Sequence, residues 1–163
     1  MSGSRENRTP EQRAERQART SAARVYAVQA LFQMEAADQS ADRVAREFRD
    51  WRIATEYEEG TTPEADETLF AAILDAVVER QARIDQMTDR ALVAKWPIAR
   101  IDPVLRALFR AAGAELIGRA TPPKVVIAEY IRVAEAFFAD GPEGRLVNAV
   151  LDQMAREARP DSF

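Results

Sequence analysis

The sequence predicts an all-α protein, a compact bundle of about six to seven helices. Apolar residues recur at helical spacing from about residue 22 onward, and prolines and short polar breaks divide the chain into helix-sized segments. No run of β-branched residues alternates for long with a period of two, so strands are not expected. The 163 residues suit one domain, and 47% apolar residues can form a sizeable core.

The first helix is predicted to begin at Pro10 and to run to about Asp38. Thr9 is placed as its N-cap, and Gln12 is placed for a capping box. The helix changes character near Ser21, because arginines recur before this point with no apolar face. After it, one side is apolar and carries Val25, Val28, Leu31 and Phe32.

Three more helices are predicted before residue 97. The second covers 41–53, with an apolar face of Val44, Phe48 and Trp51, and an acidic loop follows at 54–62. The third starts at Thr62-Pro63, and the fourth stops at Trp96-Pro97 because a residue before proline avoids helical geometry.

The remaining chain predicts three helices of ten to twenty residues. Asp102-Pro103 repeats the cap-and-proline start, 120–123 forms a break, and 141–144 forms a turn before a last helix that Pro160 ends. Gly113, inside the first of these helices, should permit close approach of a neighbouring helix. We expect one domain over 10–160, with halves of roughly 20–95 and 97–160 that share a core, and tails at 1–9 and 161–163.

The chain contains no cysteine and no histidine. Disulfides, a thiol nucleophile, a Ser-His-Asp triad and an ordinary zinc site are therefore excluded, and we expect no enzyme activity, no metal and no cofactor. No segment has the apolar length of a signal peptide or a membrane helix, so the cytoplasm is the expected location.

Charge is unevenly distributed along a chain whose net charge is −4. Residues 1–24 carry six arginines and three glutamates, whereas residues 54–67 carry six acids and no base. Within a basic arm at 10–24, Arg13, Arg16 and Arg19 form one stripe that Arg24 extends by a turn. The spacing of these arginines favours two interpretations equally: an RNA-binding arm and a solvated helix end. The arginines at 43, 46, 49 and 52 alternate with acids and are better interpreted as a solvated face.

Several aromatic residues lie on predicted apolar faces, and most of them should belong to the core. Phe138 stands at a helix end beside a polar turn and is the one we expect to be exposed. These residues are Phe32, Phe109, Tyr130, Phe137 and Phe138.

Four segments in order resemble the NusB family of bacterial transcription antitermination factors. Residues 23–32, Ala-Arg-Val-Tyr-Ala-Val-Gln-Ala-Leu-Phe, resemble its first-helix pattern, and residues 103–117 resemble its Leu-Arg to Glu-Leu segment. Residues 122–129, Pro-Pro-Lys-Val-Val-Ile-Ala-Glu, and 146–152, Leu-Val-Asn-Ala-Val-Leu-Asp, match two further family motifs. The resemblance covers about 20–160.

The resemblance implies a fold of two three-helix-type halves and a function without catalysis. Family members pair with a small-subunit ribosomal protein, NusE, and the pair binds boxA RNA so that RNA polymerase, with other Nus factors, passes terminators, notably in ribosomal RNA operons. The implied RNA-binding residues are Arg13, Arg16, Arg19, Arg24, Arg110 and Lys124. The implied partner-binding residues are Phe32, Leu105, Arg106 and Phe109.

The chain departs from the family pattern at functional positions. Thr20, Ser21 and Ala22 stand where the family often has consecutive arginines, so the basic charge lies further upstream. Leu146 replaces an aromatic residue, and leucine stacks less well on a base.

Two alternatives to the adaptor stay open at this stage. The chain resembles the NusB-like module of RNA cytosine methyltransferases as well, although it has neither a cofactor-binding domain nor a catalytic cysteine. It is alternatively a homodimer whose association covers the basic arm, since NusB proteins occur as monomers and as dimers.

Overall fold

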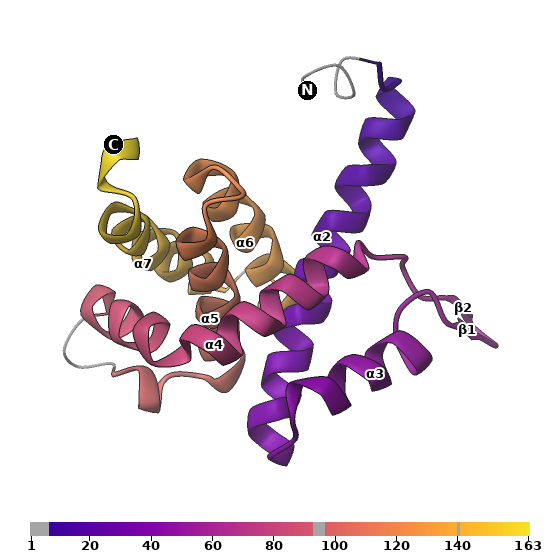
Figure 1. The fold of residues 1–163 in the computed structure, drawn as a ribbon, viewed down its shortest axis with the longest axis horizontal. Coiled ribbons are helices and arrows are strands. Elements are labelled where there is room, and N and C mark those ends of the chain that lie inside the picture. Colours follow the sequence, from indigo (N-terminus) through magenta and orange to yellow (C-terminus); the bar gives the residue numbers. More distant parts are fainter. Residues whose placement is uncertain (1–6, 93–96, 140) are drawn as a thin grey trace.

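A computed structural model describes residues 7–92, 97–139 and 141–163 of the chain (Figure 1). The described part contains six α-helices, two short 3₁₀ helices and one two-stranded hairpin, which confirms the predicted all-α class. The helices are α2 (Pro10–Ala37), α3 (Ala41–Trp51), α4 (Glu67–Ala91), α5 (Pro103–Gly118), α6 (Pro123–Phe137) and α7 (Glu143–Ala158). The strands are β1 (Glu56–Tyr57) and β2 (Gly60–Thr61), and the 3₁₀ helices are η1 (Ile98–Arg100) and η2 (Pro160–Ser162).

Two predicted helix starts are present in the structure. The Thr9 hydroxyl accepts from the backbone N–H of Gln12 at 3.1 Å, and the Gln12 side chain accepts from the N–H of Thr9 at 3.0 Å, which completes the capping box of α2. Asp102 caps α5 by accepting from the N–H of Val104 at 2.7 Å. Of the predicted tail at 1–9, residues 1–6 lie outside the described residues, and Thr9 is fixed as this cap.

The predicted third helix start at Thr62-Pro63 was wrong. Helix α4 begins at Glu67, where the Asp66 carboxylate caps it by accepting from the N–H of Leu69 at 3.0 Å. Thr62 and Pro63 instead close the preceding hairpin, because the N–H of Thr62 donates to Thr55 and the carbonyl of Pro63 accepts from Ala54. Thr62 and Asp66 are both suitable capping residues. The helix is capped by Asp66 because the backbone groups of Thr62 and Pro63 form the hydrogen bonds of the hairpin.

The acidic connector contains strands, contrary to the prediction. Tyr57 pairs with Gly60 and Glu56 with Thr61 in an antiparallel hairpin of two residues a side. Gly60 has a φ of 136°, which a residue with a side chain rarely adopts, so glycine permits this turn. The hairpin is too short to give an alternating pattern, which explains why the sequence did not indicate it.

The third and fourth predicted helices form one helix, α4, with a kink. Arg80 interrupts it with φ −124° and ψ 19°, near the boundary that the apolar pattern suggested. The helix ends at Ala91, and Leu92 is already extended, so the predicted stop at Trp96-Pro97 is too late; Trp96 itself lies outside the described residues. At 25 residues, α4 is longer than either of the two helices predicted in its place. Helix α2, with 28 residues, matches the predicted span from Pro10 to about Asp38.

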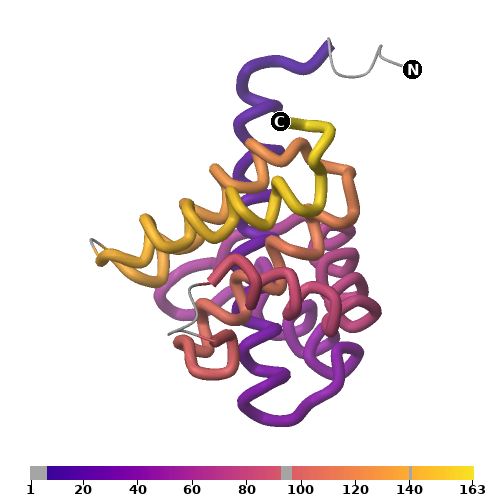
Figure 2. Tube along the Cα trace, turned by 90° about the vertical axis from the view of Figure 1, so that its left-hand side faces the viewer, coloured from indigo at the N-terminus to yellow at the C-terminus, as the bar shows by residue number. Residues whose placement is uncertain are grey.

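The core is one continuous cluster that draws on both halves of the chain. Helix α5 lies at its centre and packs against α2, α4, α6 and α7 (Figures 1 and 2). Phe48, Phe70, Phe109 and Tyr130 are fully buried in it. Trp51 was predicted on the same apolar face as Phe48 but is 67% exposed, because it is the last residue of α3 and faces solvent beside the hairpin.

Close packing at Gly113 is confirmed. A Cβ atom at this position would lie 2.5 Å from Cγ2 of Ile84 on α4 and 3.3 Å from Cε of Met154 on α7. The last helix begins at Glu143, so the second half of the predicted turn at 141–144 is helical, and η2 occupies most of the predicted C-terminal tail. None of the described helices combines the length and the apolar character that crossing a membrane requires.

Candidate nucleic-acid interface

The first two turns of α2 project from the body of the molecule (Figure 1). Every residue from 9 to 18 is exposed, and Arg19 is half-buried where the helix reaches the neighbouring elements. Proline at the first position and the capping box define the start of this segment although little of it is packed. The predicted basic arm is therefore free at its N-terminal end and packed against the body at its C-terminal end.

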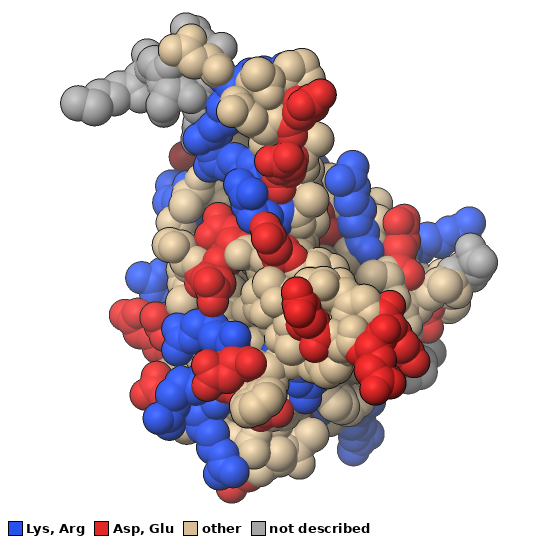
Figure 3. Space-filling model, turned by 90° about the vertical axis from the view of Figure 1, so that its right-hand side faces the viewer, with Lys and Arg blue, Asp and Glu red and all other residues tan. Residues whose placement is uncertain are grey.

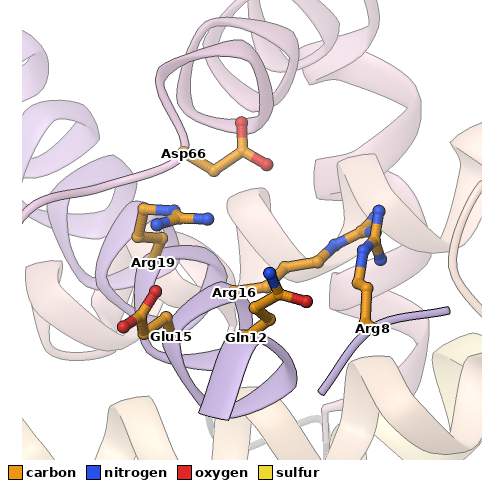
Figure 4. A pocket seen from close by; sticks show the side chains of 6 residues that line it. All are labelled: Arg8, Gln12, Glu15, Arg16, Arg19 and Asp66. Carbon is orange, nitrogen blue, oxygen red and sulfur yellow. The ribbon is translucent and has the colours of Figure 1, made fainter. Parts of the chain in front are cut away.

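The arm lines an open groove of about 700 Å³ (Figure 4). Arg16 and Arg19 contribute guanidinium groups from α2, and Arg8 contributes a third from the residues that precede the helix. Figure 4 shows Arg8 and Arg16 extending toward the same side of the groove. Three guanidinium groups around one hollow provide the forked donors that bind phosphate oxygens.

Two carboxylates lie in the same groove. Glu15 comes from α2, and Asp66 comes from the N-cap of α4, with Arg19 near both in Figure 4. The backbone N–H of Asp66 donates to the carbonyl of Arg19 at 3.0 Å, so the start of α4 is attached to the arm. Figure 3 shows blue side chains along one edge of the projecting helix and red ones along the other. The site is thus positive on one side and not uniformly basic.

Arg13 is exposed on the arm but does not line the groove. Its Nη1 donates to the backbone carbonyl of Arg8 at 2.7 Å. This contact joins the segment before the helix to the first turn and helps to place Arg8. Of the three predicted stripe arginines, the structure brings Arg16 and Arg19 together in the groove and leaves Arg13 beside it.

Arg24 does not lie on this surface, in contrast to its predicted role. It is 5% exposed, and its Nε and Nη2 donate to the two carboxylate oxygens of Glu115 at 2.9 and 3.0 Å. Burial alone would lower the pKa of Arg24, but the hydrogen bond and charge of Glu115 outweigh it and raise this pKa above its ordinary value. Burial raises the pKa of the neighbouring Tyr130 hydroxyl well above its usual value. Arg24 is a buried structural cation.

The other two predicted RNA-binding residues lie apart from the arm in the chain. Arg110, on α5, is largely enclosed, and its guanidinium donates to both oxygens of Asp85 and, at 2.9 Å, to Glu35. Lys124 is exposed in the first turn of α6. Neither residue lines the groove of the arm.

The predicted partner-binding residues fall into two groups. Phe32, which the sequence also placed in the core, is 38% exposed and lines a groove of about 420 Å³ with Val28, Val104 and Phe137. Phe109 is fully buried, and Leu105 lines a different groove, between η1 and the start of α7. Phe138 is half-buried rather than exposed.

Arg106 lines neither groove and is held by an ion pair and by hydrogen bonds to the backbone. Its side chain donates to both carboxylate oxygens of Glu35 on α2, and its Nη1 donates to the carbonyl of Ile98 in η1 at 3.1 Å. The hydrogen bond from Arg106 lowers the pKa of Glu35 below its ordinary value, against the effect of burial, and the charges of Arg106 and Arg110 act in the same direction.

Sequence reasoning missed Arg8, Gln12, Glu15 and Asp66 as groove residues. Glu15 lies three residues after Gln12 and four before Arg19, on the same face of the helix, so helical spacing carried a signal for it. Asp66 comes from another helix, and no local pattern indicates that α4 starts against α2. Among residues 7–92, 97–139 and 141–163, no group of three or more acidic side chains is arranged to hold a metal ion.

Comparisons with known proteins give one consistent family. The NusB family profile matches residues 21–156. The transcription antitermination protein NusB of Maricaulis maris (strain MCS10) is 48% identical over 143 residues, which cover 87% of this chain and 89% of that protein.

Two solved structures have a similar fold. The T. maritima NusB structure has a TM-score of 0.69 at 25% identity and covers 88% of this chain and 95% of its own. A crystal structure of antitermination factors NusB and NusE in complex with dsRNA has a TM-score of 0.68 at 21% identity, covering 84% of this chain and 96% of that one.

Proposed function

The chain belongs to the NusB family of transcription antitermination proteins, and from this premise we propose that it is an adaptor that binds boxA-type RNA together with NusE. The groove of Arg8, Arg16 and Arg19 is the observation that carries the RNA-binding part of this proposal. These residues are exposed or half-buried. Arg16 and Arg19 stand on a helix that projects from the body (Figure 1), and Arg8 stands just before the start of this helix. Such an arrangement suits phosphates of a flexible single strand.

The carboxylates in the groove add a second kind of contact. Glu15 and Asp66 accept hydrogen bonds, and the exocyclic amino groups of nucleobases are donors. A strand whose phosphates pair with the arginines would present its bases to these acceptors. Arg24 takes no part in this proposal, because it is buried and paired with Glu115.

NusE is the proposed protein partner, and the apolar groove around Phe32 is its proposed binding surface. A solved structure of a protein with this fold contains NusB and NusE with RNA. In this chain, Val28, Phe32, Val104 and Phe137 line one hollow at the surface between α2, α5 and α6. A partly exposed aromatic in an apolar hollow is a typical centre of a protein interface. Leu105, Arg106 and Phe109 would act beneath or beside this surface.

The proposed action requires no catalysis and takes place on nascent RNA in the cytoplasm. Few basic side chains face the RNA, so the chain alone should bind RNA with modest affinity. NusE should raise this affinity by adding contact area. RNA polymerase and other Nus factors would then be reached through the NusE–RNA assembly.

The test is a titration of labelled boxA RNA with and without NusE. R16A/R19A should weaken RNA binding about tenfold or more, because it removes two of the three groove cations. R43A/R46A is the matched control: it removes the same charge from exposed positions on α3 and should leave affinity nearly unchanged. The proposal fails if NusE leaves the RNA affinity unchanged and the two double variants behave alike.

A further inference from the structure

A buried polar cluster joins the base of the arm to the second half of the molecule. Two carboxylates, Glu115 on α5 and Glu129 on α6, face α2 with side chains that are 6% and 8% exposed. Glu115 binds Arg24 through two hydrogen bonds. Burying such a pair is costly unless its hydrogen bonds are complete, so the position of each carboxylate constrains the helix that it meets.

Glu129 contacts three successive turns of α2. Its Oε1 accepts from Nε2 of Gln17, its Oε2 accepts from the Ser21 hydroxyl at 3.0 Å, and the same Oε2 lies 3.6 Å from Nη1 of Arg24. Residues 17, 21 and 24 share one face of a helix. One carboxylate thus fixes both the rotation and the direction of α2 at this point.

The contact of Glu129 lies at the boundary between the packed and the free part of the arm. Within the described residues, the Gln17–Glu129 hydrogen bond is the most N-terminal one that joins α2 to another element. All residues of α2 before Arg19 are exposed. An unsupported helix of so few turns is marginal in water, so these turns depend on what holds their base.

The charge of Glu129 is balanced where it stands. Arg24 faces it from α2, and Nη1 of Arg132, one turn further along α6, lies 3.9 Å from its Oε1. An unpaired carboxylate this near to the arginines would oppose the binding of an anion. With two cations beside it, Glu129 can support the arm and not repel RNA from it.

We propose that Glu129 is a positioning residue for RNA binding: through Gln17 and Ser21 it holds the free turns of the arm helical and directed, so that Arg16 and Arg19 are presented together. This inference rests on the proposed function for its RNA part. The positioning itself is a property of the free protein. Ser21 is one of the three residues that stand where the resembled family often has consecutive arginines.

The test compares Q17A/S21A with the full chain. This variant leaves the Arg24–Glu115 pair intact and should fold. Its midpoint of thermal unfolding should lie only a few degrees below that of the parent, because Glu129 loses two hydrogen-bond donors but keeps Arg24 beside it. Amide hydrogen exchange of residues 14–20 should become roughly tenfold faster, because the anchored turns fray. Affinity for labelled boxA RNA should fall about three- to tenfold with an unchanged salt slope, because binding must now order the arm but still neutralises the same phosphates.

E129Q and Q153A complete the experiment. Glutamine at 129 retains one acceptor oxygen, so E129Q should show an intermediate effect on exchange and affinity. Q153A removes an exposed glutamine from α7 and should match the parent in both measurements. Unchanged exchange of residues 14–20 in both Q17A/S21A and E129Q would overturn the positioning role, whatever the RNA result. Faster exchange in a protein whose parent does not bind the RNA would instead uphold the anchor and refute the proposed function.

Discussion

Removal of the Arg24 side chain should test its role as a buried structural cation. R24A would leave Glu115 and Glu129 facing each other in the interior without their central cation. Breaking a buried ion pair by removing one partner costs about 3–5 kcal/mol. Urea unfolding should show this loss, whereas R49A, at an exposed position on α3, should change stability by less than about 0.5 kcal/mol. A loss below about 1 kcal/mol for R24A would contradict the structural role.

Gly113 offers a second residue-scale prediction, which concerns packing. An added methyl group would meet Cγ2 of Ile84 at 2.5 Å, so G113A should destabilise the protein by about 1–3 kcal/mol despite the better helix propensity of alanine. G118A, at the end of the same helix, is the matched control, since a Cβ atom there would have no neighbour within 4 Å. In a double-mutant cycle, G113A should cost less on an I84A background; equal costs would show that Ile84 is not the obstacle.

At the scale of elements, Glu35 connects α2 with α5 and, through Arg110, with Asp85 of α4. Its pKa is lowered in the folded protein, chiefly by the hydrogen bond from Arg106. The stabilisation is therefore fully present above the ordinary value of about 4.5 and is lost as the pH falls through the lowered value.

The difference in unfolding free energy between the parent and E35Q should follow this pH dependence. It should be constant above about pH 5.5 and shrink steadily between about pH 5 and pH 3. Its size should be modest, because the Glu35 side chain is 37% exposed and solvent screens the pair. E67Q, at an exposed position on α4, serves as the control. A difference that grows on acidification would mean that the folded-state pKa is raised rather than lowered.

Helix positions could largely be predicted from the sequence, because each helix carries its own apolar spacing and several carry local caps. Thr9 and Asp102 were sufficient to place two helix starts, since both caps act within three residues. Thr62-Pro63 had the same local pattern and gave a wrong helix start, because the N–H of Thr62 and the carbonyl of Pro63 form hydrogen bonds across the hairpin. Capping motifs thus predict a helix start only where no competing tertiary hydrogen bonds use the same groups.

The sequence was enough to predict where the candidate site lies but not which residues line it. The stripe located the arm because its periodicity is local, yet Arg24 continues that stripe and is buried. Its burial depends on Glu115 and Glu129, which are 91 and 105 positions away in the chain, and one sequence does not reveal such pairing. The position of Asp66 in the groove was likewise not predictable, since it depends on the packing of α4 against α2.

At the scale of the whole molecule, a chain of net charge −4 is proposed to bind a polyanion. Repulsion from the acidic body decays within a Debye length of about 8–10 Å at physiological salt, so charges near the strand decide the outcome. The first turns of the arm project from the body (Figure 1), and the acids that share the groove with its arginines are Glu15 and Asp66. The distribution of charge, and not its sum, should therefore determine affinity.

The salt dependence of RNA binding measures how many of these charges act. Three groove arginines that each neutralise one phosphate of a single strand give a slope of log K against log salt of about −2. Raising the salt from about 50 mM to about 200 mM should then weaken binding roughly 20-fold. R16A should make the slope shallower by about 0.7, whereas R43A on α3 should leave it unchanged, because that residue lies outside the groove. A slope near zero would exclude the groove as a phosphate site, and one steeper than about −5 would require cations well beyond the arm.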